Sequence, residues 1–267
     1  MFPNSKIVKK NSLAALKGNW AAAVAAIMIP VFFSLIVFYA GYLASELFLS
    51  GAVSVVIGIL QIAALSLIGA PLLLGTLKFF WHLSDSGEIN INHVFIYFSG
   101  KRMYTRAFHV TLLLAVRVFV IGALMFVPAF IIDFVSAGGL DSLFTTTPLW
   151  FTNLWIFAAF LRTLGFIVTA LLVFKYYLTP FIFVINDEVE PLEAMHLSRN
   201  AARFSSWNYV GLICTMLGWA LLTVFALPAF FTLPYMIMTY VIHSNFAVYY
   251  YNERIKEQRD YTADYNY

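Results

Sequence analysis

The sequence predicts an all-α fold: a polytopic membrane helix bundle with six transmembrane helices and with amphipathic helices at the cytoplasmic interface. Hydrophobic residues make up 62% of the chain and charged residues 11%, whereas roughly a quarter of the residues of a soluble domain are charged. Six apolar stretches are each long enough to cross a bilayer, because a hydrocarbon core of about 30 Å needs about 20 helical residues. Almost all Lys and Arg residues lie on one side of the membrane that these stretches imply.

The predicted transmembrane helices are apolar on all sides, as expected for helices that face lipid and one another. They cover residues 20–43, 53–80, 108–132, 151–174, 207–227 and 229–250. No linker or low-complexity tract separates them, and the longest connections carry helical patterns of their own. We therefore expect residues 1–267 to form a single integral membrane domain.

The orientation follows from the basic residues, because cytoplasmic loops retain Lys and Arg. Those before the first span, around the second and fourth connections and after the last span are Lys6, Lys9, Lys10, Lys17, Lys78, Lys101, Arg102, Arg106, Lys175, Arg199, Arg203, Arg254, Lys256 and Arg259. The opposite connections, near Glu46, over residues 133–149 and near Pro228, contain neither Lys nor Arg. Both chain ends are therefore predicted to be cytoplasmic. A cleaved signal peptide is the competing interpretation, although the basic leader and the apolar run exceed the usual lengths.

Two amphipathic helices are predicted at the cytoplasmic interface, over residues 5–18 and 191–206. In the second, Pro191 suits a first helical turn, and the acidic residues around it favour the positive end of the helix. Its apolar stripe contains Ala194, Leu197, Ala201 and Phe204. In the first, Leu13, Leu16 and Trp20 follow one another at helical spacing among lysines. Such helices lie in the membrane interface, and the candidate contact residues of the second are Leu197, Arg199, Arg203 and Phe204.

Two arginines fall inside predicted spans, Arg117 in the third and Arg162 in the fourth, and residue counting places both near mid-membrane at a similar depth. An arginine there costs at least about 2.5–3.5 kcal/mol on insertion scales. The spans contain no Asp or Glu to neutralise it, since Glu46 and Asp133 are expected near their outer ends. In one interpretation the pair lines a cavity that binds an anion, such as a lipid headgroup. In the other, the side chains cap free carbonyls or extend toward opposite membrane faces.

Prolines mark places where the predicted spans can bend, since each removes a backbone hydrogen bond. They are Pro30, Pro71, Pro128 and Pro234. Such breaks build substrate sites in some transporters, but they also merely shape helix packing. Small residues such as Ala26 and Gly75 are expected to permit close helix approach.

The sequence argues against an enzyme, because the spans contain neither paired acids nor an activated nucleophile. We predict no catalytic residues, no metal, no cofactor and no nucleic-acid partner. Two alternatives involve other polar groups. His82, His93 and His109 could gather as metal ligands, although single interfacial histidines are commoner. The acidic run between residues 187 and 193 could bind a cation, although helix-end electrostatics already explains it.

Short motifs along almost the whole chain follow the order and spacing of a known family. They are residues 15–20 (ALKGNW), 70–75 (APLLLG), 78–80 (KFF), 87–88 (GE), 192–194 (LEA), 198–199 (SR), 217–219 (LGW) and 234–235 (PY). In these motifs the chain resembles the uncharacterised bacterial membrane proteins called domain of unknown function 975, and it differs at residues 84–86 and 204–206. The resemblance implies a six-span protein of a bacterial plasma membrane without an established activity.

Two function classes remain open. The first is a non-catalytic membrane protein that binds a partner or lipid through its cytoplasmic interfacial helices. The second is a transporter or permease-like protein for an anionic or amphipathic small molecule, with Arg117 and Arg162 at a proline-broken midplane. The expected partners are the lipid bilayer and an anionic lipid or peptide, and the oligomeric state is open.

Overall fold

The structure is a computed structural model that describes residues 3–47, 51–134 and 154–264. These residues are helical with short connections and contain no strand, so the predicted all-α class is confirmed. They form two compact units, the first from residues 1–112 and 178–267 and the second from residues 113–177. The predicted connection over residues 135–149 and the start of the fourth predicted span, residues 151–153, lie outside the described residues.

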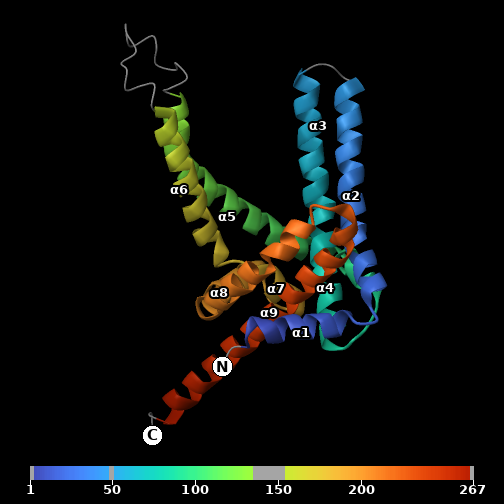
Figure 1. The fold of residues 1–267 in the computed structure, drawn as a ribbon, viewed down its shortest axis with the longest axis vertical. Coiled ribbons are helices and arrows are strands. Elements are labelled where there is room, and N and C mark those ends of the chain that lie inside the picture. Colours follow the sequence, from blue (N-terminus) through green and yellow to red (C-terminus); the bar gives the residue numbers. More distant parts are fainter. Residues whose placement is uncertain (1–2, 48–50, 135–153, 265–267) are drawn as a thin grey trace. The chain divides into compact units, whose positions relative to one another are not determined.

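Within each described range the helices follow one another with few intervening residues (Figure 1). Up to the end of the 3₁₀ segment they are α1 (Ser5–Leu16), α2 (Trp20–Leu47), α3 (Gly51–Ala64), the π-helical segment η1 (Leu65–Gly69), α4 (Ala70–Asp85) and the 3₁₀ segment η2 (Ile91–Phe98). The later ones are α5 (Lys101–Phe134), α6 (Leu154–Phe174), α7 (Thr179–Ile185), α8 (Pro191–Leu222) and α9 (Ala226–Asp264).

Four of these helical stretches are long and apolar enough to cross a membrane. They are Trp20–Leu47, Gly51–Asp85, Lys101–Phe134 and Ile156–Ile185. They match the first four predicted spans. The fifth and sixth predicted spans fall in α8 and α9, which are helical but do not belong to this set, so the count of six stays a prediction. The predicted interfacial helix over residues 191–206 continues into the fifth predicted span without a break, as the single helix α8.

Helix α1 is capped by Asn4, whose side chain accepts a hydrogen bond from the Lys6 backbone N–H, and the chain turns after the helix at Gly18, where φ is +85°. Its buried face consists of Val8, Ser12 and Leu16. Of the stripe predicted from Leu13, Leu16 and Trp20, Leu16 is buried against other helices and Leu13 is exposed, and the placement of this stripe in the membrane interface stays a prediction. Helix α1 packs on α9 and α8, which cover residues spaced four apart on its face.

Two prolines in the first unit leave backbone carbonyls near which hydroxyl groups from other helices lie. Pro71 has no N–H to donate to the Leu67 carbonyl, and the Tyr104 hydroxyl donates to that oxygen at 3.0 Å. Pro30 likewise frees the Ala26 carbonyl, which lies 3.4 Å from the Thr76 hydroxyl, a group that also donates to the Leu72 carbonyl of its own helix at 2.9 Å. These contacts agree with the packing interpretation of the prolines, because the lost bonds are replaced within the protein.

The 3₁₀ segment η2 lies directly against α4. A Cβ atom added at Gly75 would overlap the backbone of Val94, and Val94 is fully buried. Gly75 therefore permits the close approach that the sequence predicted for it. This contact holds η2, which follows α4 in the chain, against the side of α4.

Candidate functional site

The candidate contact residues of the predicted interfacial helix all lie in the first half of α8, as expected. Its buried face differs from the predicted stripe, because small residues form it: Ala194, Ser198, Ala201, Ala202 and Ser205, together with Met195. Leu197 is half-buried and Phe204 is 51% exposed. Small side chains let α7 and α9 approach α8 closely, so the large Phe204 side chain is left outside. That Phe204 belongs to a stripe facing the membrane interface stays a prediction.

Arginines and aromatic rings share an exposed surface of α8 and α9. Arg199, Arg203 and Trp207 are exposed and follow one another at four-residue spacing on α8. The guanidinium carbon of Arg254, on α9, lies 4.9 Å from the centre of the Phe204 ring, which is within cation–π distance. We call these five residues the basic–aromatic face. Basic side chains beside exposed aromatic rings suit a membrane surface, because the cations attract anionic lipid headgroups and the rings contact the outer acyl carbons.

Arg117 lies in the second unit, where it contacts a tyrosine. Its Nη1 atom donates to the Tyr176 hydroxyl at 3.0 Å, and its guanidinium carbon lies 5.3 Å from the centre of the same ring. The Nζ atom of Lys175 lies at 5.3 Å from this ring as well. Tyr176 is 7% exposed, so one buried ring serves two cations.

Arg162 has different partners at another level of the same unit. Its Nη2 atom lies 3.4 Å from a carboxylate oxygen of Asp133, and its Nε atom lies 3.4 Å from the Ala158 carbonyl. The expectation that no carboxylate would reach this arginine is wrong, because Asp133 in the last turn of α5 lies within ion-pair distance of Arg162 on α6.

The structure does not bring the two arginines together. Asp133 lies 16 residues after Arg117 in α5, which corresponds to about 24 Å along the helix. Arg117 binds at the Tyr176 end of this unit and Arg162 at the Asp133 end. The two side chains therefore bind at opposite ends of this unit, since long side chains extend away from the level of their own Cα atoms, and their similar depth in a membrane stays a prediction. These contacts favour the structural interpretation of the arginines, and a shared anion site stays a prediction.

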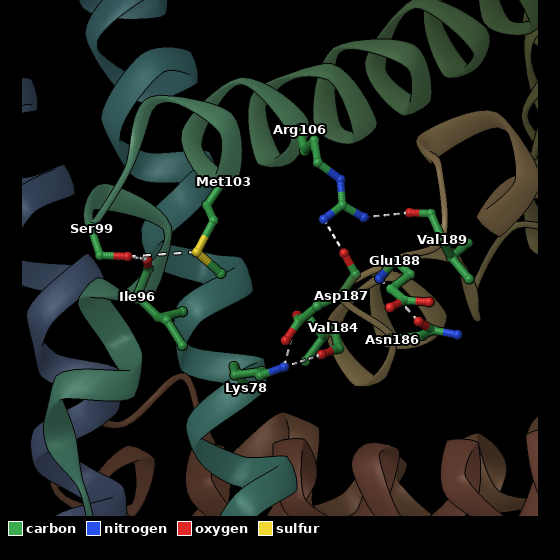
Figure 2. Close-up of polar contacts among 10 residues, drawn as sticks. All are labelled: Lys78, Ile96, Ser99, Met103, Arg106, Val184, Asn186, Asp187, Glu188 and Val189. Atoms are coloured by element: carbon green, nitrogen blue, oxygen red, sulfur yellow. Dashed lines mark hydrogen bonds and ion pairs between the residues drawn. The ribbon is translucent and has the colours of Figure 1, made fainter.

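A polar cluster that the sequence did not single out connects α4, α5 and α7 (Figure 2). Lys78, 4% exposed, donates to the Val184 carbonyl at 2.8 Å and to a carboxylate oxygen of Asp187 at 3.0 Å. Arg106 donates to the carbonyls of Asp187 and, at 2.7 Å, of Val189. The two cations thus satisfy carbonyls at and after the C-terminal end of α7, where the helix dipole favours positive charge.

The ring of Phe183 is covered by two neighbours in this cluster. The Arg106 guanidinium carbon lies 5.4 Å from its centre, and the Tyr97 ring is stacked on it at 5.9 Å. Burial raises the pKa of the Tyr97 hydroxyl well above its ordinary value, with the Asp187 charge as the second cause. We call Lys78, Arg106 and Asp187 the polar lock. The sequence explains the acidic run that contains Asp187 by its position near the positive end of a helix. In the structure Asp187 also forms an ion pair with Lys78.

Of the three histidines considered as metal ligands, the structure brings two together. His82 and His93 stack at 4.1 Å between ring centres, and Glu88 completes a group that includes neither His109 nor any other described residue. His109 lies exposed on α5.

Comparison with known proteins gives a family and no activity. The chain matches the family described as Protein of unknown function (DUF975) over residues 1–253. No curated protein and no solved structure matches it. The match covers nearly the whole chain and agrees with the motifs in α2, α4, α8 and α9. The protein therefore belongs to the DUF975 family of proteins of unknown function.

Proposed function

We propose that this protein is a non-catalytic, multi-pass protein of a bacterial plasma membrane that binds anionic lipid through its basic–aromatic face. The proposal includes six spans, cytoplasmic chain ends and interfacial segments at α1 and the start of α8. The four long apolar helices and the family match support a membrane location. The one-sided distribution of Lys and Arg supports the orientation.

The observation that carries lipid binding is the placement of Arg254 over the exposed Phe204 ring. This arrangement holds a cation 4.9 Å from an apolar group that is 51% exposed. Arg199 and Arg203 add two exposed charges on the neighbouring turns of α8, and the Trp207 ring beside them is 86% exposed. Aromatic rings of this kind favour the headgroup level of a bilayer. Each cation near an anionic surface contributes about 1 kcal/mol.

Lipid retention tests the proposal. Arg199→Gln/Arg203→Gln is purified in mild detergent beside the wild type, and the bound anionic lipid is measured by mass spectrometry. Removing two cations, at about 1 kcal/mol each, should weaken retention of phosphatidylglycerol roughly 30-fold and leave phosphatidylcholine unchanged.

The matched control is Lys101→Gln/Arg102→Gln, which removes two exposed charges from the start of α5. We expect this variant to retain anionic lipid like the wild type. Equal retention by both double variants and the wild type would contradict lipid binding at the basic–aromatic face and leave a protein partner as the better occupant.

The transporter alternative depends on both arginines in one cavity. The contacts of Arg117 with Tyr176 and of Arg162 with Asp133 support their separation along the second unit. No observation among the described residues favours transport over binding, so binding is the function that we propose.

A further inference from the structure

Two imidazoles and one carboxylate converge where α4 ends and η2 begins. Ligand atoms of His82, Glu88 and His93 all lie within 4.8 Å of one another. The rings of the two histidines are nearly parallel, with an angle of 18° between their planes. The Nε2 atom of His93 lies 3.7 Å from a carboxylate oxygen of Glu88. These groups are outside the polar lock and outside the basic–aromatic face.

The local backbone brings Glu88 back toward the end of α4. Gly87 has φ +71°, a left-handed conformation that reverses the chain after Ser86. The Ser86 backbone N–H donates to the His82 carbonyl at 3.0 Å and closes the helix. On the other side of the loop, the Asn90 side chain accepts from the Asn92 backbone N–H at 3.1 Å and begins η2. The three side chains therefore approach one another on a fixed framework.

His93 has a buried polar atom without a hydrogen bond. Its Nε2 atom is buried and makes no hydrogen bond with any described residue, while the His93 side chain is 15% exposed and the Glu88 side chain 52% exposed. Burying a polar atom without a hydrogen bond costs free energy. A cation that binds this nitrogen would remove that cost. The ion would reach the nitrogen from solvent by way of the exposed Glu88 carboxylate.

We propose that His82, Glu88 and His93 form a binding site for a divalent metal ion of the zinc type. Two imidazoles and one carboxylate are a ligand set that Zn²⁺ accepts, with a fourth position left for water. Zinc bonds of about 2.0–2.2 Å place tetrahedral ligand atoms about 3.4 Å apart. The most widely separated ligand atoms must therefore approach by up to about 1.4 Å, which rotation of the exposed Glu88 and tilting of the half-buried His82 provide. The bound ion would connect α4 to η2 at the edge of the membrane.

Direct metal binding tests this site. The full-length protein in detergent is stripped with a chelator, titrated with Zn²⁺ against a competing chromophoric chelator, and assayed for bound metal after desalting. We expect one equivalent of Zn²⁺ per chain. Co²⁺ at the same site should give the visible absorption of a tetrahedral complex with nitrogen and oxygen ligands.

Glu88→Gln is the sharpest variant, because it removes one ligand charge from an exposed side chain and keeps its shape. We expect it to weaken Zn²⁺ binding at least tenfold, since loss of even an outer-shell partner costs about 10–100-fold. His93→Asn should do the same. His109→Asn, which removes an exposed histidine elsewhere on the chain, should bind like the wild type.

Two results would overturn the proposal. One is a wild-type protein that retains no Zn²⁺ after desalting. The other is a folded Glu88→Gln protein, with wild-type elution and helicity, that binds Zn²⁺ as tightly as the wild type. Loss of binding in His109→Asn would also count against it, because the site would then lie elsewhere.

Discussion

Lys78 is the residue whose burial depends most clearly on its partners. Its side chain is 5% exposed, and its ammonium group is compensated by one carboxylate and one helix-end carbonyl. A buried cation without such partners would be costly. Asp187, by contrast, is 54% exposed, so water screens the ion pair from one side and its net contribution to stability is modest.

A double-mutant cycle measures this pair. We expect Lys78→Met and Asp187→Ala each to lower the free energy of unfolding, because each leaves a polar group with fewer partners. The double variant should lose less than the two losses added together, with a coupling of about 0.5–1 kcal/mol. Thermal unfolding in detergent gives the four values. Lys101→Met, at an exposed position, is the control, and strict additivity would show that the ion pair contributes nothing.

The sequence located several of these residues without revealing their contacts. Lys78 belongs to the motif that indicated the family, and Asp187 begins the acidic run. Their pairing was not predictable, because 109 residues separate them along the chain. Glu88 lies between His82 and His93 in the sequence, so these three residues are near one another along the chain. Only the left-handed backbone conformation at Gly87 shows that the Glu88 side chain turns toward the two histidines.

At the scale of helices, the close contact between α4 and η2 depends on the glycine at position 75, which has no side chain. Gly75 lies against the Val94 backbone so closely that no Cβ fits without movement. Backbone cannot rotate away as a side chain can, so the segment itself would have to shift.

We therefore expect Gly75→Ala to destabilise the protein by about 1–3 kcal/mol or more. The comparison is Gly58→Ala in α3, where an added Cβ would meet nothing within 4 Å. That variant should unfold at or slightly above the wild-type temperature, since alanine favours helix. Thermal unfolding in the same detergent compares them. Equal stability of the two variants would mean that η2 does not pack on α4 in this way.

Amphipathic patterns predicted where these helices occur, and the structure shows which of their residues other helices cover. α1 and α8 cover the predicted segments, yet Leu13 and Phe204 are exposed. Helical periodicity identifies an apolar stripe but not the shape of the neighbour that covers it. In α8 the neighbouring helices approach closely and select Ala194, Ser198, Ala201 and Ser205 over larger apolar side chains.

For the whole molecule, the open question with the simplest experiment is the threading through the membrane. The proposed six spans, with basic connections on the cytoplasmic side, would place both chain ends in the cytosol. A green fluorescent protein fused after Tyr267 should fluoresce, and alkaline phosphatase fused there should be inactive. Phosphatase fused within residues 135–149 should be active. Active phosphatase at the C-terminus would contradict an even number of spans with a cytoplasmic start.

The sequence by itself determined the all-helical class, four long apolar helices and the family. These properties follow from local composition: the hydropathy of some 20 consecutive residues decides whether a helix suits lipid, and short motifs keep their spacing along the chain. Only the tertiary structure decided which polar groups meet. In the structure Arg117 and Arg162 have different partners, and the Tyr104 hydroxyl donates to the Leu67 carbonyl. Glu88 lies close to His82 and His93. Such contacts depend on how helices pack and where side chains reach, and neither is fixed by the order of residues within one segment.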